Sequence, residues 1–574
     1  MSRSVQRIAK DEPVADNGMV AATHPLAVEA GLEVLRQGGN AVDAAVATAF
    51  TLAVVEPHLC GIGGGGLMVF HQASTGRDFV VDFAMDAPMS ATPDTYELAN
   101  ESGPGMFGWR RVKGDANQVG YRAAAIPGMV AGLALALDRF GTIPLRRTVE
   151  PAIRYAEEGV VMNWGLSLYI GICMDVLSRF PSTASVFLPA GFPLRSWTLG
   201  HPADRLLQPD LARTLRLIAQ RGPEGFYQGQ IARAIARAME QHGGLITEEE
   251  LARYRATVHE GGLSVDYRGH RVVGAPGASG CVTALHSLSL LEGFDVGPDD
   301  PLGLETLHLR AEVFRQAFAD RYCYVADPKQ VPVPWKGLLS KQYAAKRREG
   351  IAFDRAAQEV QPGNPWAFQE ETAPGNAGGL KGSAGGGGSS TTHLCAVDRE
   401  RNAVSLTFTL VDAFGSGAMV PETGVLLNNA MQWFDPEPGH PNSIAPGKRG
   451  LHNMTPLLVL KNGRPLLAIG ALGGRRIINA VTQVVSNVVD HRLGVQDAIA
   501  APRIDCSTPE LLLDSRLPEP TVAGLRGLGH RVQVVEESLH AEQFSRPLGI
   551  LLHPETGRLH GGVDPLRPGI AAGW

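Results

Sequence analysis

The sequence predicts a mixed α/β protein of the α+β type, with helices in the first two thirds of the chain and strands in the last third. Apolar residues recur at helical spacing over much of residues 26–253. After residue 390, alternating or continuously apolar stretches separated by short turns predict strands. The 574 residues are 44% hydrophobic and 19% charged, which is typical of a soluble globular protein. This length allows several domains or one large core.

The N-terminal part predicts two consecutive helices. Residues 26–35 have helical spacing, and Gly38 and Gly39 favour a helix end directly after them. Asn40 can then cap a second helix that runs through residues 44–55.

A glycine-rich hexapeptide, GIGGGG at residues 61–66, satisfies the G-x-G-x-x-G pattern of dinucleotide-binding proteins. That pattern binds a pyrophosphate only where a strand precedes it and a helix follows. Here a predicted helix precedes it and a strand, residues 67–72, follows. We therefore interpret the hexapeptide as a tight backbone junction rather than a nucleotide site.

The middle of the chain is also predicted to be helical. From Ile231 to Met239 an apolar residue recurs at every fourth position, and Gly243 favours the end of that helix. Thr247 and Glu250 have the spacing of a capping box, which predicts the start of the next helix.

Strand patterns appear near residue 263 and dominate after residue 390. Residues 263–275 predict two strands that turn at residues 268–269. Further hairpins are expected from residues 392–397 with 403–410, and from residues 457–460 with 466–469. The last of these turns at Asn462-Gly463, a strong signal for a two-residue hairpin. Glycine-rich residues 470–474 then lead into a helix predicted for residues 475–489.

Charge and cysteine usage exclude several classes of protein. A net charge of −6 gives no electrostatic reason to expect a nucleic-acid partner. The six cysteines are scattered without a Cys-x-x-Cys pair, which favours reduced, mostly buried thiols over disulfides or zinc. The 17 histidines include no HExxH motif. We expect neither a metal site nor a cofactor.

The sequence also bears on location. Residues 1–25 contain no apolar stretch of signal-peptide length. The longest nearly uncharged apolar run, residues 43–56, is roughly half a membrane span. We therefore expect a cytoplasmic protein without a membrane partner.

Two threonines follow a segment that has little to bury. Residues 361–390 are rich in Gly, Pro, Asn, Ser and Ala, so we expect them to be mobile. If the bond between Ser390 and Thr391 were cut, Thr391 would carry a free α-amine, whose pKa of about 7.7 to 8.0 suits a base for its own hydroxyl. The residues alone leave a second interpretation open, in which Thr391 simply begins a strand.

Such a nucleophile needs donors for the oxyanion that forms when it attacks a carbonyl. The backbone amides of Gly473 and Gly474 can supply them, because they lie at a predicted strand-to-helix junction where exposed N–H groups favour negative charge. An ordinary turn is the alternative interpretation of this glycine pair.

Motifs along almost the whole chain resemble the γ-glutamyltransferase (γ-glutamyltranspeptidase) family of N-terminal-nucleophile hydrolases. The matching stretches are GGNAVDAAVATAFTLAVVEPHLCGIGGGG, IPGMVAGLALALDRFGTIPL, GGLITEEELARYRA, TTHLCAVD, NAVSLTFTL, FGSG, LLNN, NMTP and GGRRIINAV. The resemblance implies a four-layer αββα sandwich with helical elaborations. It also implies a proenzyme that cuts itself into a large subunit, residues 1–390, and a small subunit, residues 391–574.

The resemblance assigns roles to individual residues. Thr391 corresponds to the nucleophile, and Thr409 to the threonine that hydrogen-bonds its hydroxyl. Gly473 and Gly474 correspond to the pair that forms the oxyanion hole. We assign supporting roles to the other two residues of the TTH motif, Thr392 and His393, because the mechanism needs no further base.

The specificity residues of the family are replaced in this chain. Ala84 stands where the family has the arginine that clamps the substrate's α-carboxylate, and Trp433 stands where an acid holds its α-amine. Val411 replaces an asparagine, and His452 and Asn453 replace paired serines. Asn453 can still donate to a substrate carboxylate. Losing both charged partners argues against tight binding of a γ-glutamyl group, since unpaired buried charges are costly.

Two further features bear on the missing clamps. Arg110 or Arg111 could replace the carboxylate clamp, although a surface role is the simpler interpretation. Residues 435–449 form a shorter segment than in family members that carry a lid loop over the site.

The leading hypothesis is a self-processing amidohydrolase or acyltransferase acting on small γ-glutamyl amides such as glutathione, with water or an amine as acceptor. The alternative is an acylase or amidohydrolase on another amide, similar to cephalosporin acylases or oxamate amidohydrolases. A non-catalytic binding paralogue is a third hypothesis. The resemblance implies a heterodimer of the two fragments, and the sequence leaves further oligomerisation open.

Overall fold

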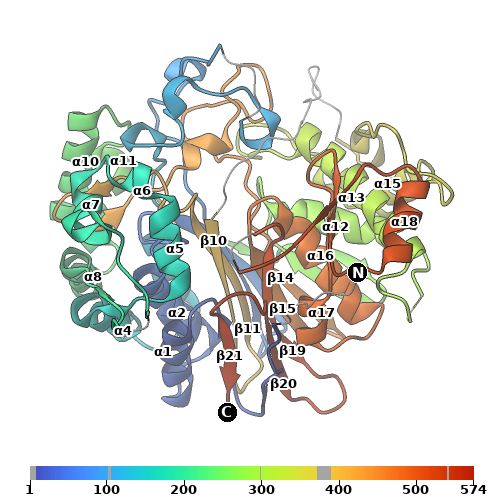
Figure 1. Cartoon of the computed structure of the whole chain (residues 1–574), viewed down its shortest axis with the longest axis horizontal. Coiled ribbons are helices and arrows are strands. Elements are labelled where there is room, and N and C mark those ends of the chain that lie inside the picture. Colours follow the sequence, from blue (N-terminus) through green and yellow to red (C-terminus); the bar gives the residue numbers. More distant parts are fainter. Residues whose placement is uncertain (1–7, 101–104, 199, 298, 372–389, 540–541) are drawn as a thin grey trace.

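Two seven-stranded antiparallel sheets stack face to face at the centre of the computed structural model (Figure 1). The structure describes residues 8–100, 105–198, 200–297, 299–371, 390–539 and 542–574. The first sheet has the order β21 (Ile570–Gly573), β2 (Met19–Ala22), β10 (Ser390–Val397), β11 (Ala403–Val411), β3 (Gly65–Gln72), β4 (Arg77–Phe83) and β7 (Thr257–Glu260). The second has the order β1 (Val14–Ala15), β20 (Leu559–Val563), β19 (Arg546–Leu552), β15 (Arg464–Leu472), β14 (Leu457–Lys461), β9 (His270–Gly274) and β8 (Leu263–Tyr267).

Helices cover the outer face of each sheet. The first sheet is covered by α1 (Pro25–Arg36), α2 (Ala41–Val55) and α3 (Met129–Phe140). On the same side, α4 (Leu145–Glu158) packs on α2, and α8 (Pro209–Arg221) packs on α4. The side of the second is covered by α12 (Gly280–Leu291), α13 (Leu304–Tyr324), α16 (Arg476–Val489) and α17 (Val495–Ala500). This arrangement confirms the predicted four-layer αββα sandwich.

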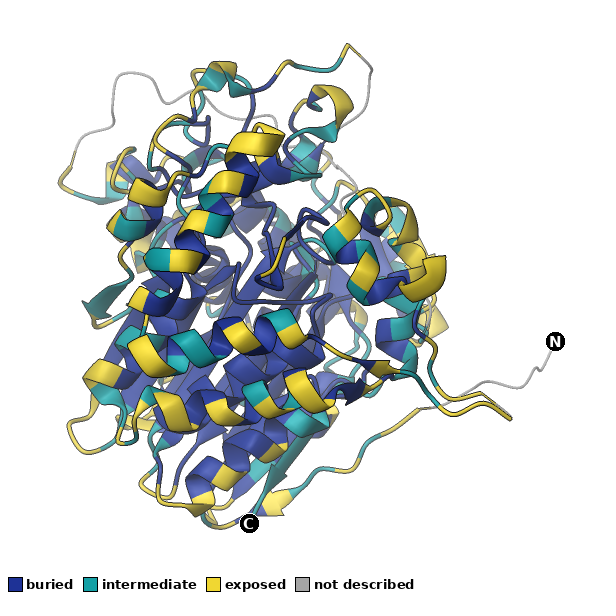
Figure 2. Cartoon of the chain, turned by 90° about the vertical axis from the view of Figure 1, so that its left-hand side faces the viewer, coloured by how far each residue is buried: buried dark blue, intermediate teal, exposed yellow. Residues whose placement is uncertain are grey.

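The central strands are buried on both faces, because helices cover one face and the other sheet covers the second. Every residue of β10 and β11 is buried. Side chains such as Leu394 and Leu406 pack toward α1 and α2, whereas Cys395 belongs to the core between the sheets. There the Ser405 hydroxyl donates to the carbonyl of Ile469 at 2.9 Å. Figure 2 shows the dark interior under helices whose outer faces are exposed.

Local sequence signals place many elements where they are expected. Asn40 and Asp43 form a capping box at the start of α2, and Gly243 ends α10 (Gly229–His242) in the left-handed conformation. The Thr247–Glu250 capping box begins α11 (Glu248–Arg253). The predicted hairpins become β8–β9, β10–β11 and β14–β15. The glycine hexapeptide follows α2 and its last two residues begin β3, which is the reverse of the dinucleotide-binding order.

Residues 361–371 differ from the mobility expected for residues 361–390. Trp366 is buried in a short helical turn, Pro365–Phe368, and Gly363 donates its N–H to the carboxylate of Asp320 at 2.8 Å. This hydrogen bond ties the segment to α13, and the buried tryptophan anchors the turn. Residues 372–389 lie outside the described residues.

The remaining expectations concern thiols and membranes. All six cysteines are unpaired and five are buried, as predicted; Cys173 is partly exposed. In the described ranges, no helix is both long and apolar enough to cross a membrane.

Candidate active site

Thr391 lies at an irregularity where β10 meets β11. Ser390 pairs with Val411 and Thr392 with Phe408, and the register shifts between them. The Thr391 hydroxyl therefore lies beside that of Thr409, to which it donates at 3.4 Å. The strand pairing brings together the two threonines that the sequence predicted to act together.

The Thr409 hydroxyl also contacts the peptide bond before Thr391. It donates to the Ser390 carbonyl oxygen at 2.5 Å and accepts the backbone N–H of Val411 at 2.8 Å. A hydroxyl has one donor and two acceptor positions, and these three contacts use all of them. The orientation of Thr409 is thus fixed, with its proton on the carbonyl of the bond predicted to be cut.

A buried chain of hydrogen bonds stabilises β10 on its outer face. The hydroxyl of Thr392 shares a hydrogen bond of 2.8 Å with that of Thr23, which in turn donates to the Glu56 carboxylate. Burial raises the pKa of Glu56 to about 7, although the Thr23 hydrogen bond and Arg567 oppose the shift.

His393 has a structural environment on the inner face. Its Nδ1 shares a hydrogen bond of 2.8 Å with the Thr407 hydroxyl, and its ring lies against Gly470 of β15. Burial lowers the pKa of His393 to about 3. This environment supports the role we predicted for it in packing.

The glycine pair forms the junction between β15 and α16. Both residues have positive φ, 122° for Gly473 and 65° for Gly474, which other residues rarely adopt. A Cβ at Gly473 would lie 2.8 Å from the Cα of Ser545. Glycine is therefore required at this junction by both conformation and space.

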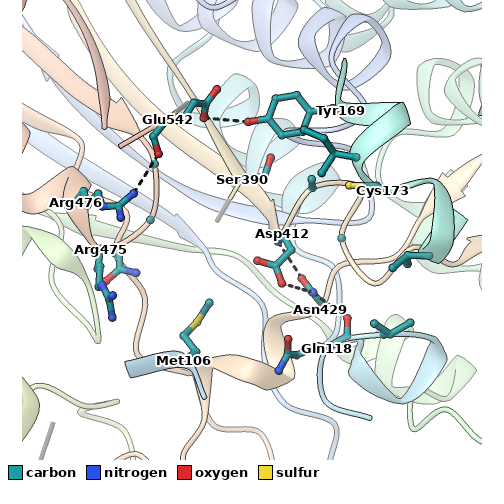
Figure 3. Close-up of a pocket in the computed structure, with 18 of the residues that line it drawn as sticks. Met106, Gln118, Tyr169, Cys173, Ser390, Asp412, Asn429, Arg475, Arg476 and Glu542 are labelled. Atoms are coloured by element: carbon teal, nitrogen blue, oxygen red, sulfur yellow. Dashed lines mark hydrogen bonds between the residues drawn. The ribbon is translucent and has the colours of Figure 1, made fainter. Parts of the chain in front are cut away.

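A cavity of about 540 Å³ connects these groups (Figure 3). Its lining includes Ser390, Gly473, Gly474 and Asn453, which were predicted as site residues, together with side chains that were not. Thr391 is buried immediately beside this lining, with 4% of its surface exposed. The cavity thus places space for a small ligand next to the predicted nucleophile and the glycine pair.

Asn453 is oriented by a buried arginine that the sequence did not reveal. Arg321 donates to the Asn453 side-chain oxygen at 3.1 Å and to the His452 carbonyl at 2.8 Å. The Asn453 amide nitrogen then remains available as a donor, and Asn453 lines the cavity. Nothing in the helical pattern of residues 304–324 marks Arg321 as buried.

The other three tentative substrate residues are buried and do not belong to the lining of the cavity. Ala84 is 1% exposed, and the Tyr254 hydroxyl donates to its carbonyl at 2.7 Å. Trp433 and His452 are buried with ring centroids 5.4 Å apart. Burial lowers the pKa of His452 to about 3.

Neither arginine proposed as a replacement clamp lines the cavity. Arg110 lies 3.6 Å from Glu437 and donates to the carbonyl of Ala99. Arg111 pairs with Asp115 at 2.9 Å.

The cavity carries other charged side chains that sequence reasoning missed. Arg475 and Arg476 line it directly after the glycine pair, and Asp412 and Glu542 line it as well. Figure 3 shows the Asp412 carboxylate between Ser390 and Asn429. The signal available in the sequence was the position of Asp412, a lone charge that directly follows the apolar strand at residues 403–411.

Comparisons with known proteins show which family the chain belongs to. The family model described as gamma-glutamyltranspeptidase matches residues 27–574. The chain is 39% identical to an acylase ACY 1 proenzyme of Pseudomonas sp. (strain V22), over 91% of this chain and 88% of that protein. It is 35% identical to the glutathione hydrolase proenzyme of Bacillus subtilis (strain 168), over 98% and 92% of the two chains.

A solved structure is similar over the full length. The cephalosporin acylase from Bacillus halodurans superposes with a TM-score of 0.85 at 31% identity, covering 100% of this chain and 98% of that one. The sequence match, the sandwich and the arrangement around Thr391 lead to one conclusion: the chain belongs to the γ-glutamyltranspeptidase family of N-terminal-nucleophile hydrolases.

Proposed function

We propose that this protein is a proenzyme that cuts its own Ser390–Thr391 bond and then uses Thr391 to hydrolyse or transfer the acyl group of a small amide. One observation carries the proposal. The Thr409 hydroxyl accepts a hydrogen bond from Thr391 and donates one to the Ser390 carbonyl. It therefore holds the attacking oxygen and polarises the carbonyl that is attacked.

In the self-cleavage step, Oγ1 of Thr391 bonds to the carbonyl carbon of Ser390, and the peptide C–N bond breaks. The Thr391 nitrogen leaves as an amine with the proton lost from the hydroxyl. Water hydrolyses the resulting ester, which frees the Ser390 carboxylate and returns the Thr391 hydroxyl. The products are fragments of 390 and 184 residues, which remain together as a heterodimer.

In the amide reaction, the new α-amine takes the proton of the Thr391 hydroxyl as its oxygen attacks the substrate carbonyl. The amides of Gly473 and Gly474 stabilise the oxyanion. The leaving amine takes the proton, and water or an amine then releases the acyl group from Thr391.

The identity of the acyl group in the substrate is a separate question. γ-Glutamyl amides such as glutathione are favoured by the resemblance to glutathione hydrolases. Another acyl group is favoured by the buried, apolar Ala84 and Trp433 at the two clamp positions, and by the resemblance to acylases.

Denaturing electrophoresis tests the cleavage. The wild-type protein gives two fragments with a new N-terminal threonine by mass spectrometry, and Thr391→Ala gives a single band. An uncut wild-type chain that still binds small amides would instead support a non-catalytic scaffold. A panel of p-nitroanilides with γ-glutamyl, glutaryl, oxamoyl and simple acyl groups then ranks the substrates.

A further inference from the structure

Asp412 is a carboxylate without a counter-ion in the cavity lining. Its Oδ2 accepts hydrogen bonds from the side-chain amides of Asn429 at 2.9 Å and Gln432 at 2.6 Å. Its Oδ1 is enclosed, and no described group donates a hydrogen bond to it. In the described part of the chain, no Lys, Arg or His pairs with Asp412. An enclosed carboxylate in this state is costly, so its presence in the cavity calls for a partner.

Neutral side chains fix the orientation of this carboxylate. The Asn429 side-chain oxygen accepts the backbone N–H of Asp412 at 3.1 Å, while its amide nitrogen also donates to the Gln118 carbonyl at 2.9 Å. Asn429 and Asp412 therefore hold each other reciprocally. Asp412 also follows Val411, whose φ of +89° is rare for a β-branched residue. The chain maintains a strained turn where it presents this carboxylate.

The unpartnered Oδ1 requires a hydrogen-bond donor, and a positively charged donor is favoured because no described cation pairs with Asp412. The cavity also contains the groups assigned to the reaction, Ser390, Gly473 and Gly474. A ligand in contact with Asp412 would therefore lie beside the reacting bond.

We propose that Asp412 binds an ammonium group on the acyl part of the substrate and thereby selects amino-bearing acyl amides. This inference rests on the proposed amidohydrolase function and deepens it. Asp412 takes over the role that an acid at position 433 cannot fill, since Trp433 stands there. It is a specificity residue that contacts the substrate away from the bond that breaks.

The test compares two substrates that differ only in the ammonium group, γ-glutamyl-p-nitroanilide and glutaryl-p-nitroanilide. The variant Asp412→Asn keeps the shape and can still accept hydrogen bonds from Asn429 and Gln432. We expect its kcat/KM for the γ-glutamyl compound to fall at least tenfold, with the glutaryl value within threefold of wild type.

Controls separate specificity from charge and folding. Asp175→Asn removes a nearby acid that pairs with Arg179 at 3.8 Å and does not line the cavity, so both substrates should be unaffected. Asp412→Glu, which keeps the charge, should retain part of the preference for γ-glutamyl. Self-cleavage of each variant reports that it folds.

Two outcomes would overturn the inference. An equal loss for both substrates would place Asp412 on the α-amine of Thr391 instead, and no loss for either would remove it from binding. Failure of self-cleavage in the wild-type protein would contradict the proposed function itself and is distinguishable from both.

Discussion

The hydroxyl of Thr409 donates to the carbonyl oxygen of Ser390 at 2.5 Å, so a side chain assigned to the mature enzyme already acts on the uncut bond. The same hydroxyl accepts a hydrogen bond from Thr391. Maturation and catalysis therefore share one supporting residue, and a substitution there should affect both.

Replacing Thr409 by valine should slow self-cleavage about 100-fold or more, because loss of a donor to a developing oxyanion typically has that effect. Valine keeps the shape of threonine without its hydroxyl. Thr409→Ser, which keeps the hydroxyl, should cleave within about tenfold of the wild-type rate. The measurement is the time course of fragment formation on denaturing gels after synthesis in a cell-free system. Cleavage of the valine variant at the wild-type rate would contradict this role.

Gly473→Ala should lower the kcat/KM of the amidase reaction 100-fold or more. The new Cβ would approach the Ser545 backbone at 2.8 Å, at a φ of 122°, and so displace the amides of the pair. Gly463→Ala is the matched control, since Gly463 also has positive φ, 76°, but has open space around it and lies in the β14–β15 turn. This variant should lose about 1 kcal/mol of stability, because alanine is disfavoured at positive φ, and it should retain kcat/KM. Similar kcat/KM losses in the two variants would show that the effect is not local to the cavity.

The pH dependence of stability should change in Glu56→Gln. Burial raises the pKa of Glu56 from 4.5 to about 7, so between these values the native state holds a proton that the unfolded state has released. Stability therefore falls as pH rises through this window, by on the order of 3 kcal/mol. Glutamine has no such proton. Urea unfolding from pH 4.5 to 8 should show the fall in the wild type and a shallower slope in the variant; parallel curves would contradict the assignment.

Ala84→Arg should destabilise the protein by about 3 kcal/mol or more without improving γ-glutamyl turnover. Ala84 is enclosed in the core, and its neighbours Asp82 and Asp86 already pair with Arg449. An added guanidinium would be buried without a free partner. Met89→Arg, at a side chain that is 59% exposed, should be nearly neutral. Thermal unfolding gives the difference, and a stable Ala84→Arg with raised γ-glutamyl activity would show that position 84 reaches the acyl group.

Elements with local signals could be predicted from the sequence. The capping box at Asn40 and the Asn462-Gly463 turn depend on residues within a few positions of each other, and these contacts form wherever the segment lies. The strands β2 and β21 could not be predicted from the sequence, because their segments, MVAA and IAAG, are short and consist largely of small side chains. Their pairing comes from neighbours more than 150 residues away in sequence.

The candidate site shows the same division. Thr391, Thr409 and the glycine pair could be predicted because motifs carry them. Asp412 and Arg321 could not be predicted in this way. Asp412 is distinguished by an unpartnered carboxylate oxygen, and Arg321 by its complete burial. Both properties arise only when distant elements pack together. The clamp positions illustrate the reverse case, because a motif position such as Ala84 need not face the cavity in this chain.

The strand order also determines what a cut at Ser390 would leave behind. In the first sheet β2, from before the cut, lies between β21 and β10, from after it. In the second sheet β1 and the β8–β9 pair, from before the cut, flank four strands from after it. Neither fragment contains a complete sheet, so neither can bury its own strand edges. We expect the nicked protein to unfold in a single cooperative transition, and fragments produced separately to fold only when mixed.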